Sequence, residues 1–303
     1  KYFKILKDIN KNTKITLIRS QRKKNIHHES MADHVVDSVD SAIKKGIQCA
    51  FICSPSSEHS KQALILAKNK IHYFVEKPIS NSMKNLKSLI NTTKRKKVHA
   101  HVGYVLQELR SFKKLKKKIN LKNVSTIYCE ALSYLPKWKK DSFKNYPYSY
   151  KNLGGGALLE LSHEIDYIRN IFGEIKFVSA QYIYSNNLKI NVESGANLTF
   201  YLTNNIIVNL ILNFDSKINS RKCRINLKNG FIIWDIARDN IISENKKYKK
   251  ENIKYAYKNQ ILNFLKKIKT NKLSHTSLLN SVQTLKVIVG AFKSNKLKKV
   301  IKV

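Results

Sequence analysis

A lysine in one short segment and a histidine in another could act together on one substrate carbon. Lys77 lies in the turn Glu76-Lys77-Pro78, directly after an apolar run. His163 follows Glu160 by three positions in a segment opened by three glycines. An imidazole that titrates near neutrality can accept a proton, and an ammonium group can stabilise negative charge developing on an oxygen. If the two side chains meet, the chain is suited to proton-coupled hydride transfer.

The first third of the chain alternates apolar runs with helix-like stretches, for example the helix predicted over 58–70. Strands are predicted at 14–18, 49–53, 71–75 and 98–102. Strands that are buried on both faces and separated by helices form a parallel, doubly wound sheet. Ligands bind beyond the carboxyl ends of such strands. Ser54, Lys77 and Tyr104 all lie at these ends, so we expect them to share a site.

The pattern changes after about residue 121. A strand at 124–132 is followed by an aromatic, lysine-rich loop over 134–150 and a helix over about 155–172. Further strands are predicted at 177–184, 196–202, 206–214, 222–227 and 231–236. No helical period separates these strands, which favours an antiparallel sheet. Two helices, at about 258–269 and 277–294, precede a last short apolar run at 300–303.

The helix over 155–172 should be amphipathic. Glu160, His163, Glu164 and Tyr167 recur at helical spacing and predict one polar side. The alternative is a solvated polar face that happens to hold a histidine, and the helix taken alone would favour it. The histidine's pairing with Lys77 and the glycine opening favour the catalytic interpretation.

Composition narrows the class of protein. With 303 residues and 42% hydrophobic content the chain can bury a large core, and its length suggests about two domains. No apolar run approaches the roughly 18 residues of a membrane span, and no signal peptide is recognisable. The four cysteines lack metal-ligand spacing, so we expect free buried thiols, no metal site and a reducing cytoplasm.

The net charge of +38 would attract phosphorylated or anionic partners. The lysines are spread over the whole chain, however, and no basic-aromatic recognition motif accompanies them. We therefore interpret runs such as 113–118 as solvated helix faces and do not expect a nucleic-acid partner.

Four segments together resemble the glucose–fructose oxidoreductase/inositol dehydrogenase/MocA family. They are Phe51 to His59, Glu76-Lys77-Pro78, Gly154 to Asp166, and Asn229 to Asp235. The resemblance covers nearly the whole chain. It implies an α/β protein with a Rossmann-type doubly wound parallel sheet at 1–104, which binds NAD(P), and a large mostly antiparallel α/β domain at 105–303.

The resemblance also assigns roles to residues. Lys77 and His163 would flank the substrate carbon, with Glu160 at a position where the family usually has aspartate. The cofactor would lie beside Ser54, Pro55, His59, Glu76, Lys77 and Pro78. His59 could equally be a surface residue at the start of a helix.

One part of the family pattern is missing. The family opens with a strand and a glycine-rich loop that holds the pyrophosphate, yet none of the 303 residues form a GxGxxG motif. Residue 1 already lies in an expected helix, with Tyr2, Phe3, Ile5 and Leu6 as its apolar face. We expect an N-terminal truncation and a gap in the sheet where the first strand belongs. The alternative is an inactive, degenerate relative that serves as a binding or scaffold protein.

The residues after the 14–18 strand bear on cofactor choice. NAD enzymes usually place a carboxylate there, whereas this chain has Arg19, Ser20, Gln21 and Arg22. A guanidinium and a hydroxyl suit a 2′-phosphate, so Arg19, Ser20 and Arg22 predict NADP, with NAD as the alternative.

Aromatic and amide side chains are the substrate candidates. Tyr104, Gln107, Trp138, Tyr148 and Tyr150 lie in segments that line the family's cleft, and their rings suit a sugar. They could equally pack between domains. The family often has asparagine and arginine after Gly-Tyr, but this chain has Val105 and Gln107 there, which argues against binding of an acidic group at that point.

The resemblance therefore implies a sugar or nucleotide-sugar oxidoreductase. The segments at 134–138 and 220–224 resemble members that make surface polysaccharides. A homo-oligomer formed through the open sheet is expected, in the cytoplasm and without a membrane partner.

Overall fold

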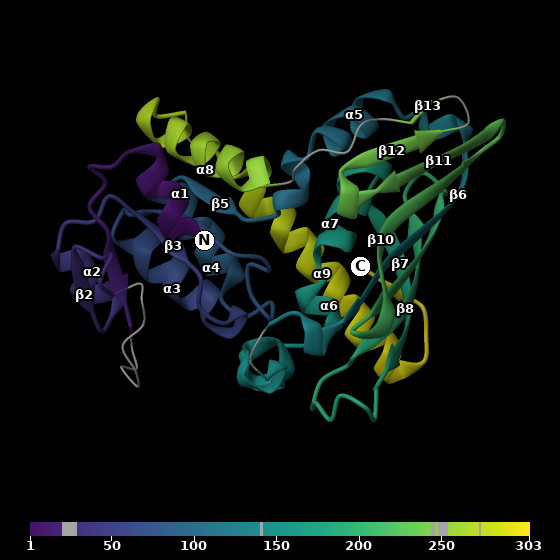
Figure 1. Ribbon diagram of the computed structural model, residues 1–303, viewed down its shortest axis with the longest axis horizontal. Coiled ribbons are helices and arrows are strands. Elements are labelled where there is room, and N and C mark those ends of the chain that lie inside the picture. The colour runs from purple at the N-terminus through teal and green to yellow at the C-terminus, as the bar shows by residue number, and fades with distance from the viewer. Residues whose placement is uncertain (20–28, 140–141, 244–245, 248–253, 273) are drawn as a thin grey trace.

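The protein consists of a parallel-sheet part and a broad nine-stranded sheet, joined by a long helix (Figure 1). The computed structural model describes residues 1–19, 29–139, 142–243, 246–247, 254–272 and 274–303. The long helix, α9 (Thr276–Leu297), contacts β5 of the parallel part and β7 of the large sheet. Because both parts cover it, α9 buries apolar residues along most of its length, from Leu278 to Ala291.

The parallel strands are β1 (Thr16–Ile18), β2 (His34–Val36), β3 (Cys49–Ile52), β4 (His72–Val75) and β5 (Ala100–Val102). β1 pairs with β2, while β3, β4 and β5 pair in that order. Among the described residues no backbone pairing joins β1 to β3, so the expected gap in the sheet is present. The strand β2 was not predicted, because its two apolar residues, Val35 and Val36, stand in a polar context that includes Asp33 and Asp37.

Helices cover the parallel strands on both faces. They are α1 (Tyr2–Ile9), α2 (Val39–Lys44), α3 (Ser56–Lys68) and α4 (Leu86–Arg95). From the far end of the chain, α8 (Lys254–Lys269) joins them: the ring of Phe264 lies 5.6 Å from that of Phe51 and 5.8 Å from that of Phe74. This segment therefore packs on the first part although it follows the large sheet in sequence.

The large sheet has the order β13-β12-β11-β10-β6-β9-β8-β7-β14. Its strands are β6 (Val124–Tyr134), β7 (Ile175–Ile183), β8 (Gly195–Leu202), β9 (Ile207–Asn213), β10 (Asp215–Leu227), β11 (Gly230–Asp235), β12 (Asn240–Ser243), β13 (Lys246–Lys247) and β14 (Ile301–Lys302). Every neighbouring pair is antiparallel except β6 and β9. The predicted α/β class with one parallel and one mostly antiparallel sheet is thus confirmed.

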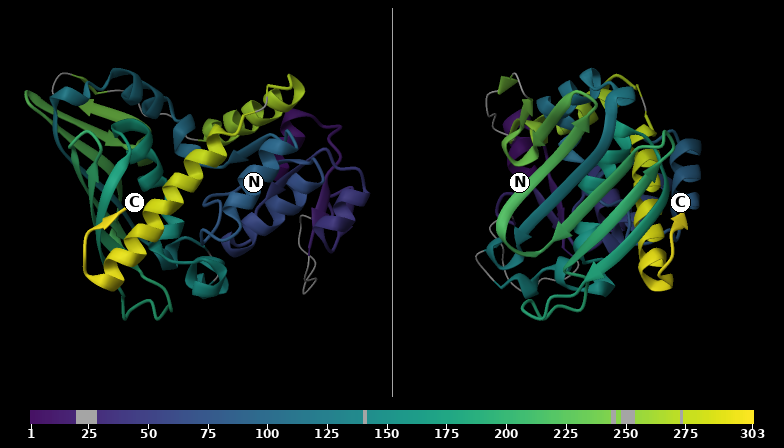
Figure 2. Two further views of the ribbon diagram at one scale, coloured as in Figure 1. Left: turned by 180° about the vertical axis from the view of Figure 1, so that it is seen from behind. Right: turned by 90° about the vertical axis from the view of Figure 1, so that its right-hand side faces the viewer.

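One face of this sheet is covered and the other is open. In β9 the side chains of Val208, Leu210 and Leu212 are buried, whereas Ile207 and Ile211 are exposed. This alternation follows from the two-residue period of a strand. Helices lie behind the sheet in the right-hand view of Figure 2, and the face toward the viewer carries none.

The helix predicted over 155–172 is interrupted. It consists of α6 (Ala157–Glu160) and α7 (His163–Phe172), with a turn at Leu161 and Ser162. The alternative of a solvated polar side does not hold for Glu164 and Tyr167, because both residues are completely buried. The turn rotates α7 relative to α6, so the helical spacing used for the prediction does not run through.

Short helices occupy the remaining connections. They are α5 (Arg110–Lys118) and the single 3₁₀ turns η1 (Val105–Glu108), η2 (Leu121–Asn123), η3 (Leu135–Lys137), η4 (Phe143–Asn145), η5 (Pro147–Ser149), η6 (Lys151–Leu153) and η7 (Ile236–Arg238). None of the described helices combines the length and apolar character that a membrane crossing requires.

All four cysteines are free, as predicted. Cys129 and Cys223 are buried on paired strands, with their sulfur atoms 3.3 Å apart. Cys49 is only half-buried, and Cys53 is exposed, so the prediction of burial is wrong for Cys53. The reason is that β3 ends at Ile52, which leaves Cys53 on the lip of a cleft.

Candidate active site

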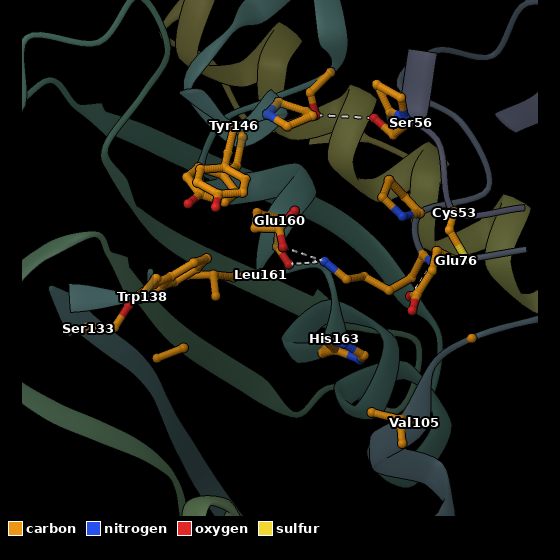
Figure 3. A pocket seen from close by; sticks show the side chains of 18 of the residues that line it. Cys53, Ser56, Glu76, Val105, Ser133, Trp138, Tyr146, Glu160, Leu161 and His163 are labelled. Carbon is orange, nitrogen blue, oxygen red and sulfur yellow. Dashed lines mark hydrogen bonds and ion pairs between the residues drawn. The ribbon is translucent and has the colours of Figure 1, made fainter. Parts of the chain in front are cut away.

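A cleft of about 540 Å³ lies where the ends of the parallel strands face the large sheet (Figure 3). Its parallel-sheet wall consists of Cys53, Ser54, Pro55, Ser56, His59, Glu76, Lys77, Pro78, Gly103 and Val105. Its antiparallel-sheet wall consists of residues 131–133, Trp138, 146–148, Leu153, Gly154, Glu160, Leu161, His163 and 219–221. Lys1 and Tyr257 also contribute. The volume lies within the roughly 300–1,000 Å³ of small-molecule sites.

Lys77 reaches from one wall to the other. β4 ends at Val75, and the turn that follows places Lys77 on the parallel-sheet wall of the cleft. The Lys77 Nζ atom donates to the backbone oxygen of Glu160 at 2.6 Å and lies 3.1 Å from Glu160 Oε1. The lysine is therefore held at the end of α6, beside the start of the helix that carries the histidine. The glutamate in place of the family's aspartate is compatible with this contact.

His163 lines the same cleft as the first residue of α7. Its Nδ1 atom is enclosed and lacks a hydrogen-bond partner among the described residues. Burial lowers the pKa of His163 well below its ordinary value of 6.5, and the positive charges of Arg221 and Lys77 lower it further. The imidazole is consequently neutral at pH 7, the form that can accept a proton. Lys77 and His163 are thus brought together, as their sequence context suggested.

Tyr104 lies behind the histidine. Its ring meets that of His163 edge-on, with centroids 5.5 Å apart and planes at 87°. Only 4% of Tyr104 is exposed, and the residue does not line the cleft. The geometry therefore gives Tyr104 a packing contact with His163, whereas the sequence suggested contact with substrate.

His59 connects the two turns of the parallel-sheet wall. Its Nδ1 atom lies 2.7 Å from the backbone oxygen of Pro78, and its Nε2 atom lies 2.7 Å from that of Ser54. Burial lowers the pKa of His59, and the two carbonyl contacts partly oppose that effect. The residue is almost fully buried, so the alternative of a surface histidine at a helix start is wrong.

The parallel-sheet wall fits the nicotinamide end of a dinucleotide. Ser54, Pro55 and Pro78 lie at the carboxyl ends of β3 and β4, the edge at which such sheets bind nucleotides. Gly103 ends β5 without a side chain, where a Cβ would lie 3.1 Å from the ring of Phe74. The 303 residues contain no GxGxxG motif, and we assign no residue to the pyrophosphate.

Of the three residues proposed to select the cofactor, the structure describes Arg19. Ser20 and Arg22 lie outside the described residues. Arg19 forms an ion pair with Glu29, which approaches the end of β1 although it is ten positions away. The sequence interpretation found no carboxylate at this strand end, and the structure supplies one. The choice of NADP over NAD therefore stays a prediction.

The substrate candidates divide into two groups. Trp138 and Tyr148 line the cleft, with their rings 5.5 Å apart in an edge-on contact, and Tyr146 stacks on Tyr148. Tyr150 is exposed and lies outside the cleft lining. Gln107 also lies outside it, because its amide donates to the buried carboxylate of Asp166 at 2.8 Å. The geometry thus supports Trp138 and does not support direct contact by Gln107 or Tyr150.

Two residues of the site had no recognisable role in the sequence. Glu193 caps α6 by accepting from the backbone nitrogen of Leu158 at 3.1 Å, and burial raises its pKa to about 7. Arg221 enters the cleft from β10, held by Glu164. Both contacts join segments that are distant in the chain, so no local spacing could have indicated them. Within the described residues no cluster of side chains could hold a metal ion.

Two family models match the chain. The model described as "Oxidoreductase family, NAD-binding Rossmann fold" matches residues 1–104, and the "GFO/IDH/MocA C-terminal domain" matches residues 112–233. Together they cover most of the chain and agree with the division between the parallel and antiparallel sheets.

Curated relatives are about a quarter identical to this chain over the aligned residues. Myo-inositol 2-dehydrogenase of Thermotoga maritima is 28% identical over 148 residues, which are 48% of this chain and 39% of that protein. The 2,7-anhydro-N-acetylneuraminate hydratase of Escherichia coli is 25% identical over 169 residues, 54% of this chain and 44% of that protein. The matched part thus spans about two fifths of these relatives' length.

Solved structures match over nearly the whole fold. The WlbA dehydrogenase of Bordetella pertussis, in complex with NADH and UDP-GlcNAcA, superposes with a TM-score of 0.81 at 13% identity, over 99% of this chain and 93% of that one. Levoglucosan dehydrogenase in complex with NADH reaches a TM-score of 0.82 at 15% identity, over 96% and 90% of the two chains. At such identities the likeness concerns the fold alone.

Proposed function

Since the chain belongs to the GFO/IDH/MocA family of oxidoreductases, we propose that it transfers a hydride between a nicotinamide cofactor and a hydroxyl-bearing carbon of a sugar or nucleotide sugar. The observation that carries this proposal is the meeting of Lys77 and His163 in one cleft at the end of β4. A reacting carbon in that cleft would have a proton acceptor and a cationic donor within reach.

The roles of the residues follow from their environments. When bound, a nicotinamide cofactor would accept or supply the hydride. The neutral imidazole of His163 takes the hydroxyl proton during oxidation and returns it during reduction. The Lys77 ammonium, fixed by its contacts with Glu160, donates to the same oxygen and stabilises its developing charge. Glu160 is thereby a positioning residue for Lys77.

A sugar is the substrate class that the cleft suits best. Trp138 and Tyr148 offer aromatic faces that can pack against the C–H groups of a sugar ring. Several relatives are dehydrogenases of sugars or polyols, and the WlbA structure contains a nucleotide sugar. One curated relative is a hydratase, so relationship alone does not fix the reaction. A role in surface-polysaccharide synthesis stays a prediction from the sequence.

For the cofactor we keep the sequence-based prediction of NADP, with Arg19 as the residue that supports it. For assembly we propose a homo-oligomer that forms through the open face of the large sheet (Figure 2). That face carries exposed large apolar side chains on neighbouring strands, which would be covered in such an assembly. They are Tyr128, Tyr201, Ile207, Ile211 and Phe231.

The test of the activity uses both cofactors and a small panel of sugars. The chain is incubated with NADP⁺ or NAD⁺ and with myo-inositol, D-glucose or D-glucuronate, and the ultraviolet absorbance of reduced nicotinamide is followed. We expect reduction of the cofactor with at least one sugar, and none when Lys77 is replaced by alanine. Absence of both cofactor binding and turnover would instead support the alternative of an inactive family member.

A further inference from the structure

Arg221 is a cation in the cleft that hydride transfer itself does not require. It lies on β10, opposite Ala131 of β6, and 27% of its side chain is exposed. It shares the cleft with Lys77 and His163. Its charge is close enough to His163 to lower the pKa of that imidazole. A substrate whose reacting carbon lies beside His163 would therefore lie beside Arg221 as well.

Glu164 holds one edge of the Arg221 guanidinium. Nε of Arg221 donates to Glu164 Oε1 at 2.6 Å, and Nη2 donates to Oε2 at 3.1 Å. Glu164 is fully buried, whereas the arginine is partly exposed. The buried carboxylate of Glu164 thus holds the Nε and Nη2 atoms of Arg221 in place. Because the guanidinium is planar and rigid, this contact fixes the orientation of the whole group. Within the described part of the chain no hydrogen-bond partner is found for Nη1 of Arg221.

The unused edge of the guanidinium indicates what kind of ligand it would take. A guanidinium has five N–H donors in a rigid plane, and the contact with Glu164 uses only the Nε side. The Nη1 group and the remaining N–H of Nη2 form a second pair of parallel donors. Two parallel donors match the two oxygens of a carboxylate, whereas a single hydroxyl would engage one of them.

Arg221 is also placed where the end of β5 offers no charged group. The amide of Gln107, which follows β5, donates to the buried Asp166, and the residue does not line the cleft. Among the described residues, the segment after β5 therefore contributes only Gly103 and Val105 to the cleft lining. Arg221 supplies a cation from the opposite wall, on β10.

We propose that Arg221 determines substrate specificity by binding a carboxylate group of the substrate, so that the enzyme prefers a sugar acid to the corresponding neutral sugar. This inference rests on the proposed function, because it assumes that a sugar occupies the cleft. Glu164 is then the positioning residue that aims the arginine. The competing explanation is that Arg221 serves only as the counter-ion of a buried carboxylate.

The test compares D-glucuronate with D-glucose, which differ in having a carboxylate or a hydroxymethyl group. Binding of each to the full chain is measured by isothermal titration calorimetry. We expect the wild-type protein to bind glucuronate about tenfold more tightly, as one additional charge-assisted contact implies. Equal affinities, or binding of neither sugar, would overturn the inference.

Two variants separate specificity from structure. Arg221→Met combined with Glu164→Gln removes both charges, so that no buried carboxylate is left unpaired, and should abolish the preference while changing glucose affinity less than about threefold. Arg221→Lys keeps the charge but loses the planar pair of donors, and should retain only part of the preference. Arg221→Lys is the variant to be measured if the double variant fails to fold. An undiminished preference in a folded variant would contradict the role of Arg221.

Turnover distinguishes this inference from the proposed function. Oxidation of glucose and glucuronate with equal KM would refute the inference and leave the oxidoreductase intact. Tight, Arg221-dependent binding of glucuronate without any cofactor reduction across the sugar panel would refute the proposed function and leave the carboxylate site standing.

Discussion

The two walls of the cleft reach their geometry by different means. On the parallel-sheet wall, three short segments follow the ends of β3, β4 and β5, and His59 ties two of them together through backbone oxygens. On the antiparallel-sheet wall, side chains from β6, α6, α7 and β10 converge, and the ion pair between Arg221 and Glu164 joins two of these elements. A wall built from backbone suits a ligand that is common to many enzymes. A wall built from side chains can vary with the substrate.

Lys77 is the residue of the first wall that should matter most to the chemistry. Lys77→Ala removes the ammonium group that faces Glu160, and we expect turnover to fall by about a thousandfold because the developing charge loses its donor. Cofactor affinity, measured by fluorescence titration, should change little. Lys61→Ala, which removes an exposed lysine of α3, is the matched control and should leave turnover unchanged. A large loss of cofactor affinity in Lys77→Ala would move the residue from catalysis to binding.

The antiparallel-sheet wall should be more sensitive to changes in packing than the parallel-sheet wall. A Cβ atom at Gly155 would lie 2.5 Å from the backbone oxygen of Tyr148, so Gly155→Ala must displace the segment that carries this aromatic ring. We expect a loss of about 2–3 kcal/mol in the free energy of unfolding, measured with urea, and a raised KM for the sugar.

Gly46→Ala is the control for the loss of a glycine. Its φ of +73° carries strain, but no atom lies within 4 Å of the added Cβ. It should cost only about 1–2 kcal/mol and leave the KM for the sugar unchanged. An equal effect on KM from both replacements would show that the close approach at Gly155 does not shape the cleft.

Charges from both walls affect the pKa of His163, since Lys77 lies on the parallel-sheet wall and Arg221 on the antiparallel-sheet wall. Because burial, Arg221 and Lys77 all lower its pKa, the neutral base persists as the pH falls through 6.5. The acid limb of kcat/KM for sugar oxidation should therefore lie below pH 6.5, and the Arg221→Met, Glu164→Gln variant should move it to higher pH. A limb at or above the ordinary histidine pKa in the wild-type enzyme would mean that another group, or a solvated His163, controls the rate.

The smallest expected effect concerns Arg19 at the end of β1, outside the cleft. Glu29 engages the guanidinium of Arg19, so Glu29→Gln should remove one carboxylate that competes with a 2′-phosphate for that charge. The ratio of NADH to NADPH dissociation constants should rise up to about fivefold, the size of one partly exposed ion pair. Asp8→Asn is the matched control, since it removes an acidic charge from a different part of the surface. An unchanged ratio in Glu29→Gln would exclude Arg19 from cofactor selection.

The sequence predicted the parallel-sheet wall of the site better than the antiparallel-sheet wall, and the difference has a physical reason. The run Phe51 to His59 and the turn around Lys77 each consist of neighbouring residues whose shared place at strand ends follows from parallel topology alone. Every predicted strand of the parallel sheet was found, and the missing pairing between β1 and β3 was anticipated.

The opposite wall could not be read in the same way. Arg221 faces the cleft because β10 pairs with β6 in one particular register, and a shift of one residue would turn it to the other face. Gln107 and Tyr104 were assigned to substrate from their place after a strand, yet a buried acid and a neighbouring ring take their side chains away. The break between α6 and α7 likewise depends on tertiary packing, and it separates Glu164 and Tyr167, which are buried, from the polar side on which the spacing had placed them with Glu160.

The most direct measurement of the central claim is a double-variant cycle on Lys77 and His163. Turnover of a sugar that the wild-type enzyme oxidises is measured for Lys77→Ala, His163→Ala and the double variant. If both groups act on one carbon as a unit, each single variant should lose about a thousandfold, and the double variant should lose little more. A loss in the double variant equal to the product of the two single losses would show that the groups act independently, and would contradict the account.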